Sequence, residues 1–141
     1  GFVFYTNYQS EKALGIEHHS KVGISFFWPI LERQVIIKGE AFKIEAKISD
    51  AYFKSRPKGS QIGAIVSDQS KVITDRSTIE AKQEALEIEY TNKNIERPEH
   101  WGGYLVKPIS IEFWQGRPNR LHDRIRCQLQ GNFWNIERLA P

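Results

Sequence analysis

The stretch that decides the fold is "SIEFWQGRPNRLHDRIRCQLQ", residues 110–130. Two runs rich in alternating apolar and polar residues flank a Gly-Arg-Pro-Asn turn, which is the pattern of an antiparallel β-hairpin. Successive side chains of a strand point to opposite faces of its sheet. The pattern therefore predicts that Arg120, His122, Arg124 and Arg126 share one face of the second strand, with the apolar residues between them turned to the core.

That basic face has two interpretations. Trp114 belongs to the preceding strand, and an indole beside a row of guanidinium groups suits a flat, anionic, aromatic ligand. Arginine binds phosphate or carboxylate in a bidentate fork and also stacks on rings. The alternative is a solvated strand face whose arginines pair with Asp and Glu. His122 likewise either contacts a ligand or only steadies Asp123 or a backbone carbonyl.

Further segments of the chain have the same strand character, and helices are inserted between them. Ser10 is a suitable N-cap for the first helix, Ser60 marks the start of the third, and Ser77 with Glu80 forms a capping box for the longest one. The predicted strands are 1–6, 21–28, 32–44, 102–107, 110–115, 120–130 and 133–139, and the predicted helices are 10–20, 49–56, 60–67 and 77–90. We expect a mainly β protein, either an antiparallel barrel with inserted helices or an α+β sheet, in one domain over residues 1–141.

Composition limits the classes of function. With 40% hydrophobic and 12% aromatic residues the chain should fold, and no apolar run reaches the roughly 20 residues that a membrane helix needs. The net charge of +3 is spread along the chain, which favours small anions over nucleic acid as partners. Cys127 is the only cysteine, so an internal disulfide is excluded, and no metal site is expected. We expect a cytoplasmic protein.

Two further segments could bind an anion. In "YFKSRPKGSQIGA", residues 52–64, Arg56, Lys58 and Ser60 lie around a helix end and the start of the next helix, whose free N–H groups favour a phosphate. In "SDQS", residues 67–70, the side chains of Gln69 and Ser70 could donate hydrogen bonds to phosphate or sugar oxygens. The alternatives are an ordinary helix cap with exposed charges and an ordinary turn.

Five motifs together resemble one known family. "SRPKGSQIGAIVSDQS", "WGGY", "IEFWQG", "RLHDR" and the terminal "ERLAP" are similar to those of pyridoxine/pyridoxamine 5'-phosphate oxidases, and the resemblance covers essentially the whole chain. It implies an FMN-binding split β-barrel that forms a homodimer with FMN at the subunit interface. It further implies oxidation of pyridoxamine and pyridoxine 5'-phosphate to pyridoxal 5'-phosphate in vitamin B6 metabolism, with O2 as electron acceptor and H2O2 released. The rival hypothesis is a split-barrel protein that binds flavin or a B6 phosphate without catalysis.

The resemblance also implies roles for individual residues. Those expected to contact FMN fall into two sets from different subunits: Tyr5, Thr6, Lys12 and Gln34 from one, and Gln69, Ser70, Trp114 and Arg124 from the other. Those expected to hold the substrate phosphate are Tyr52, Arg56 and Ser60. Arg120, Leu121 and His122 match the "RLH" that closes over the substrate ring, where Arg120 and His122 are the expected catalytic residues.

Two departures from the family pattern affect the expected flavin site. Glu11 stands where many members have an arginine next to Lys12, so a carboxylate near the flavin phosphate should weaken binding. The sequence opens at Gly1 without the R-x-V-L-L-K strand motif whose Arg and Lys contact FMN and substrate in longer members. This is the pattern of a fragment or a processed chain, and we expect such a form to hold FMN poorly.

Overall fold

The computed structural model describes residues 1–141, which form six strands and four α-helices. In chain order the elements are β1 (Phe2–Asn7), α1 (Glu11–His18), β2 (Lys21–Trp28), β3 (Arg33–Lys43), α2 (Ala46–Ser55), α3 (Lys58–Val66), α4 (Ser77–Glu89), β4 (Trp101–Gln115), β5 (Asp123–Gln130) and β6 (Phe133–Leu139). Short 3₁₀ turns, η1 (Pro29–Leu31) and η2 (Pro118–Arg120), precede β3 and β5. The prediction of a mainly β protein with inserted helices is confirmed. None of the helices combines the length and the apolar character needed to cross a bilayer.

The strands form an open sheet. Their order is β2-β3-β4-β5-β6, with β1 also paired to β4, and the end strands β2 and β6 are not paired with each other. A barrel requires the first and last strands to close on one another. The barrel expected from the sequence is therefore not closed within this chain.

The chain divides into two compact units. The strand unit comprises residues 1–2, 20–42 and 106–141, and the helical unit comprises residues 3–19 and 43–105. Each unit is described by itself below.

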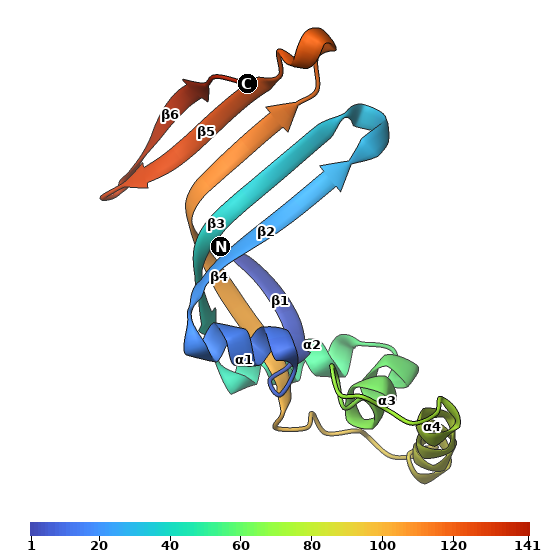
Figure 1. The fold of residues 1–141 in the computed structure, drawn as a ribbon. Helices are drawn as coiled ribbons and strands as arrows, with labels where there is room; N and C mark the ends of the chain where they lie inside the picture. The colour runs from blue at the N-terminus through green and yellow to red at the C-terminus, as the bar shows by residue number, and fades with distance from the viewer. The chain divides into compact units, whose positions relative to one another are not determined.

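The strand unit is built from two antiparallel hairpins, β2–β3 and β5–β6, together with the second half of β4 (Figure 1). In the β4–β5 register Trp114 lies opposite Arg124, and Glu112 opposite Arg126. Gly39 of β3 allows a close approach to β4, because a Cβ there would lie 2.3 Å from the carbonyl oxygen of Lys107.

The predicted strand over 120–130 is wrong at its start. β5 begins at Asp123, and Arg120 lies in the η2 turn with φ of 62°, next to Asn119 with φ of 59°. A strand cannot continue through left-handed backbone of this kind. Arg120 and His122 therefore do not share the strand face of Arg124, and the alternation holds only from Asp123 onward.

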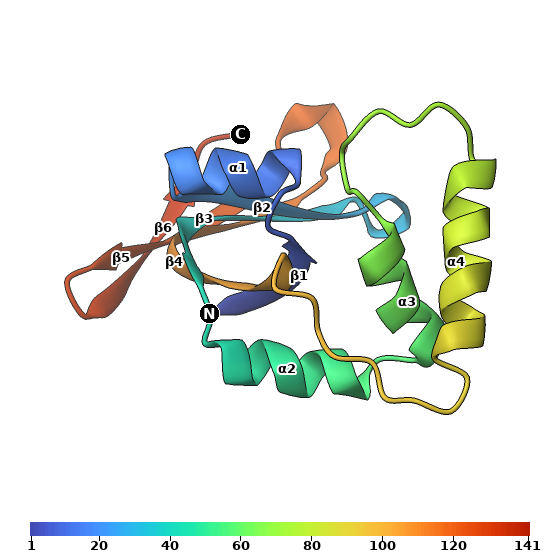
Figure 2. The same cartoon turned by 90° about the horizontal axis from the view of Figure 1, so that it is seen from below.

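The helical unit carries the main hydrophobic cluster. Phe53 of α2, Ile62 and Val66 of α3, and Trp101 at the start of β4 are buried together with Ala64 and Ile95. Ile79, Leu86 and Tyr90 recur at helical spacing and so fall on one side of α4, and they pack against this cluster. Figure 2 shows α3 and α4 side by side. The longest helix thus covers the core through the apolar side that its sequence predicts.

Helix starts were predicted with mixed success. Ser10 is the N-cap of α1, and its hydroxyl accepts a hydrogen bond from the backbone N–H of Ala13. Ser60 does not start α3, which begins at Lys58 after Pro57. The capping box of α4 is wrong as well, because the N-cap is Arg76, whose side chain makes no cap bond, and the Ser77 backbone N–H donates to Asp75 Oδ1 at 3.0 Å. There Glu80 accepts from the guanidinium of Arg76 instead.

Candidate functional site

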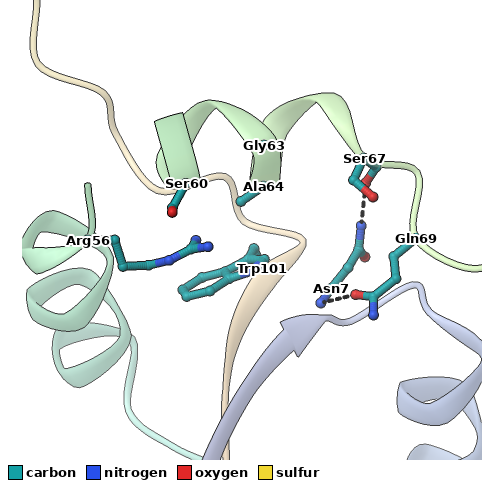
Figure 3. A pocket seen from close by; sticks show the side chains of 8 residues that line it. All are labelled: Asn7, Arg56, Ser60, Gly63, Ala64, Ser67, Gln69 and Trp101. Atoms are coloured by element: carbon teal, nitrogen blue, oxygen red, sulfur yellow. Dashed lines mark hydrogen bonds between the residues drawn. The ribbon is translucent and has the colours of Figure 1, made fainter. Parts of the chain in front are cut away.

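A polar pocket lies where α2 ends and α3 begins. Its volume is about 250 Å³. The lining residues are Asn7, Arg56, Ser60, Gly63, Ala64, Ser67, Gln69 and Trp101 (Figure 3). Arg56 and Ser60, two of the residues expected to hold the substrate phosphate, are thus brought together in one cavity.

The sequence around Pro57 explains why Arg56 reaches this pocket. A residue before proline is pushed out of the helical region, and Arg56 has extended φ and ψ of −74° and 149°. Helix α2 therefore stops at Ser55, and α3 starts again directly after Pro57. At this break between the two helices, the Arg56 side chain lies next to the first turn of α3, where Ser60 lies (Figure 3).

The Arg56 guanidinium is available for a ligand. Its Nη1 atom is buried and has no hydrogen-bond partner, which is costly unless a ligand or water satisfies it. The guanidinium carbon lies 4.7 Å from the centroid of the Trp101 ring, so the cation rests on an aromatic face that takes none of its N–H donors. A buried, unsatisfied arginine N–H beside a serine hydroxyl suits a phosphate or carboxylate.

Lys58, the third basic or polar residue of the same sequence motif, serves a different purpose. Its ammonium group donates to the backbone carbonyls of Tyr90 and Thr91 at the end of α4. A cation at a helix C-terminus is favourable because the last carbonyls lack partners. The prediction that Lys58 crowds the anion site is therefore wrong.

Aromatic rings extend from the pocket wall. Tyr5 stacks on Tyr52 with ring centroids 3.8 Å apart, and it stacks on Trp101 at 5.4 Å. Burial raises the pKa of the Tyr5 hydroxyl, with a smaller contribution from Tyr52. Tyr5 was expected at the flavin and Tyr52 at the substrate phosphate, and the structure brings these two side chains into contact.

Several expected flavin residues also lie in the helical unit. The Thr6 hydroxyl donates to Oε1 of Gln69 over 3.1 Å, and the backbone N–H of Asn7 donates to the same oxygen at 3.1 Å. The resemblance places Thr6 and Gln69 in different subunits, whereas here they are bonded within one chain. Gln69 keeps its amide N–H₂ free for a ligand. Ser70 follows with φ of 73°.

Two more residues of the helical unit concern the site, Lys12 and Asn7. Lys12 lies in α1 and is exposed, without a partner in this chain. Asn7 was not among the predicted site residues, although it lines the pocket and donates to the Ser67 carbonyl at 3.3 Å. Its position, at the end of a strand before the N-cap of a helix, looks like ordinary turn chemistry in the sequence.

In the strand unit, the arginines of the basic face are paired with acidic side chains. Arg124 donates to Glu112 at 2.7 Å, and Arg126 donates to Glu137 at 2.6 Å. The bond to Glu112 raises the pKa of Arg124. Of the two interpretations of this face, the structure supports the one in which the arginines pair with acidic residues, because carboxylates from neighbouring strands pair with Arg124 and Arg126.

A second cavity of the strand unit, of about 400 Å³, contains two expected flavin residues. Gln34 and Trp114 both line it, beside Arg33 and Phe113. Gln34 donates to the Ser25 hydroxyl at 3.2 Å, which leaves its amide oxygen available. An aromatic wall with amide and guanidinium groups at its edge is the kind of site that a flat heterocycle fits.

The turn before β5 carries the expected catalytic residues. Nδ1 of His122 accepts from the backbone N–H of Arg117 at 3.2 Å, and the imidazole lies 4.8 Å from the Trp114 ring. A neutral imidazole whose Nδ1 accepts must carry its proton on Nε2, which is then a donor. The alternative in which His122 only steadies Asp123 is not seen, because its one hydrogen bond in the chain is to the Arg117 backbone. Asp123 instead accepts hydrogen bonds from Arg117 and Arg138. Both bonds lower the pKa of Asp123, and the bond from Arg117 has the larger effect.

Arg56 and Arg120 differ from every other arginine. Arg33 is bonded to the Gln115 amide, and Arg76, Arg97, Arg117, Arg124, Arg126 and Arg138 each pair with a carboxylate. Arg56 and Arg120 have no side-chain partner of either kind. Leu121, next to Arg120, is 68% exposed. The two arginines expected at the substrate are thus the two that have no side-chain hydrogen-bond partner within the chain, whereas Arg33 has the neutral Gln115 amide.

The chain is thus a mainly β protein with one polar pocket that contains an unpartnered arginine N–H and one cavity with an aromatic wall. Comparison with known families gives a closer assignment. The family described as pyridoxamine 5'-phosphate oxidase matches residues 1–90, and the pyridoxine 5'-phosphate oxidase C-terminal dimerisation region matches residues 101–141. The chain belongs to the pyridoxamine 5'-phosphate oxidase family.

Individual relatives agree with this assignment. The pyridoxine/pyridoxamine 5'-phosphate oxidase of Flavobacterium psychrophilum is 58% identical over 100% of this chain, and that of Flavobacterium johnsoniae is 60% identical over 99%. The chain spans 66% of the length of each.

Two solved structures are similar as well. PhzG from Burkholderia lata 383, in complex with tetrahydrophenazine-1-carboxylic acid, is 27% identical with a TM-score of 0.92, covering 100% of this chain and 69% of its own. A pyridoxamine 5'-phosphate oxidase-related, FMN-binding protein from Nostoc punctiforme has a TM-score of 0.75 at 16% identity, covering 99% of this chain and 72% of its own. The second likeness concerns the fold alone.

Proposed function

We propose that this chain is part of an FMN-dependent oxidase that converts pyridoxamine 5'-phosphate and pyridoxine 5'-phosphate into pyridoxal 5'-phosphate. The observation that carries the proposal is the buried, unpartnered Nη1 of Arg56 in a pocket with Ser60. A phosphate ester would satisfy this atom. The names of relatives at 58% and 60% identity support the same substrates.

The residues present fit a flavin. Trp114 offers a ring face and Gln34 a free amide oxygen in one cavity, while Gln69 and Ser70 offer donors elsewhere in the chain. Arg124 would contribute a charge that Glu112 partly compensates. FMN, when bound, would supply the acceptor for the substrate's hydride and pass its electrons to O2, which leaves as H2O2.

The chain's own residues would then position the substrate and would not themselves react. Arg56 and Ser60 would bind the phosphate, with Tyr52 beside them, and so fix one end of the substrate. Arg120 would hold the substrate ring, with Leu121 excluding water. His122 would donate a hydrogen bond from Nε2, because its Nδ1 already accepts from Arg117.

Assembly into a homodimer is part of the proposal. The C-terminal region that matches this chain is described as a dimerisation region. The TM-score of 0.92 to PhzG supports the fold of the single chain. The split β-barrel with FMN at the subunit interface is proposed from the resemblance. Light scattering on the full-length protein should give twice the chain mass, and a monomer in the presence of FMN would count against this part.

The test of function uses the full-length protein with FMN. Peroxide release and formation of pyridoxal 5'-phosphate should follow addition of pyridoxamine 5'-phosphate, and pyridoxamine without its phosphate should be a much poorer substrate. Binding of both FMN and the phosphate ester without any peroxide or aldehyde would support the rival, a non-catalytic binding protein. Absence of binding altogether would reject both.

A further inference from the structure

Arg56 is held in place by residues that have no role so far in the proposed function. Its backbone N–H donates to the Phe53 carbonyl at 3.2 Å, and Pro57 fixes the direction in which the chain leaves α2. Its carbonyl oxygen accepts from Nε2 of Gln61 at 2.8 Å. Gln61 belongs to α3 and donates also to the Lys54 carbonyl at 3.4 Å. The last carbonyls of α2, which lack intrahelical partners, are thus held by one amide of the next helix.

The side chain of Arg56 is held by an aromatic ring. Trp101 is only 7% exposed, and its ring lies 4.7 Å from the guanidinium carbon. Phe53 packs edge-on against Trp101, with the two ring centroids 5.4 Å apart at an interplanar angle of 66°. Tyr5 stacks on Trp101 at 5.4 Å. The indole is therefore fixed by its neighbours and offers Arg56 a rigid surface.

An aromatic support differs chemically from a carboxylate support. A carboxylate would orient the guanidinium by accepting from its N–H groups and would neutralise its charge. A ring face attracts the cation without accepting any in-plane N–H bond. Arg97, which lies nearby in the helical unit, shows the other solution, since Asp50 accepts from it at 2.6 Å. Arg56 keeps both its charge and its donors.

We propose that Trp101 and Gln61 are positioning residues that hold Arg56 ready for the phosphate of the substrate, Trp101 through the guanidinium and Gln61 through the backbone carbonyl. This inference rests on the proposed function and adds two residues to it. Neither residue needs to touch the substrate for this role. Their effect should therefore appear only for ligands that carry a phosphate.

The experiment measures binding of pyridoxine 5'-phosphate and of pyridoxine by calorimetry, in the FMN-loaded full-length protein and its variants. Trp101→Leu should weaken binding of the phosphate ester roughly tenfold, as expected for loss of a desolvated cation–π contact. Binding of pyridoxine should change by less than about twofold, within the spread of surface effects. Trp101→Phe should recover most of the loss, because phenylalanine also offers a ring face.

Three controls sharpen the result. In an Arg56→Ala background, Trp101→Leu should have little further effect, since the two act through one group. Gln61→Leu, which leaves the aromatic cluster intact, should give a smaller but equally phosphate-specific loss. Tyr104→Leu removes another buried aromatic from β4 and should leave the ratio of the two affinities unchanged.

Two failures can be told apart. A wild-type protein that binds neither ligand or prefers pyridoxine would reject the proposed function itself. A wild-type protein that prefers the phosphate ester, with variants that lose both ligands equally or neither, would overturn only the positioning role and leave Trp101 and Gln61 as structural residues.

Discussion

Arg56 and Arg126 are both partly buried arginines, yet their surroundings use them in opposite ways. Arg126 donates to Glu137 at 2.6 Å, so its charge is compensated and its donors are occupied. Arg56 rests on the Trp101 ring and keeps a buried Nη1 without a partner. A basic side chain in a sheet can thus be a structural element, while one at a helix junction is available to a ligand. The partner of the guanidinium, rather than its exposure, separates the two cases.

The largest effect should come from removing the free arginine. Arg56→Ala should lower kcat/KM for pyridoxamine 5'-phosphate by on the order of a hundredfold, because one or two charge-assisted bonds to the phosphate are lost. Arg56→Lys should recover only part, since an ammonium lacks the planar fork. Steady-state peroxide assays on FMN-loaded full-length protein measure this.

The matched control for this variant is Arg126→Ala. It removes a guanidinium that is already paired at a partly exposed site, so activity should change by less than about threefold. A comparable loss from both substitutions would break the distinction between free and compensated arginines.

The second effect concerns Arg120, the other arginine without a side-chain partner. Arg120→Ala should reduce kcat/KM roughly tenfold to a hundredfold, which corresponds to about 1.4–2.8 kcal/mol of transition-state binding. FMN affinity should stay nearly constant, because Trp114 and Arg124 are the proposed flavin contacts. Parallel FMN titrations separate the two roles, and Arg76→Ala at the exposed N-cap of α4 is the control. Joint loss of flavin binding and activity would move Arg120 to the cofactor site.

Some local features of this molecule were predictable from the sequence, although the starts of α3 and α4 were not. Ser10 caps α1 because a serine before a helical run can accept a free N–H, and Pro57 ends α2 because the residue before it cannot stay helical. The apolar side of α4 follows from its helical periodicity. Each of these outcomes depends on residues within a turn or two of one another.

The partners of the arginines were not predictable in this way. Whether Arg124 and Arg126 stay free depends on Glu112 and Glu137, which reach them only through the register of β4, β5 and β6. The support of Arg56 by Trp101 likewise joins α2 to the start of β4. The placement of Arg120 off the strand depends on the positive φ angles after Pro118, which the alternating pattern does not reveal.

A third effect tests the other buried atom without a partner, the hydroxyl of Tyr104. Unlike Nη1 of Arg56, it does not line the pocket at the α2–α3 junction. Tyr104→Phe should therefore leave activity unchanged and raise the free energy of unfolding by about 1 kcal/mol, since an unsatisfied buried hydroxyl is costly. Denaturant titration measures this, and a loss of stability would show that the hydroxyl has a partner in solution.

The same variant has a signature at high pH. Burial raises the pKa of Tyr104 above its ordinary 10.0. Above pH 10.0 the unfolded chain releases this proton more readily than the folded one, so the wild type should lose stability as pH rises from there. Tyr104→Phe removes that contribution, and its alkaline unfolding curve should be shallower.

The smallest effect concerns the compensated side of the comparison. Hydrogen bonds from Arg117 and Arg138 hold the pKa of Asp123 below its ordinary 3.8. A group with a depressed pKa in the folded state stabilises above its unfolded value, and that contribution is lost as pH falls through the folded pKa. The wild type should therefore lose stability below pH 3.8 more steeply than Asp123→Asn, which has no proton to bind there. Thermal unfolding from pH 5 to pH 2 measures the two slopes, with Asp68→Asn in the exposed turn after α3 as the control. Because Asp123 is exposed to solvent, the difference should be small and should shrink further in high salt. Equal slopes at low salt would mean that this cluster of paired charges orders the turn without contributing to stability.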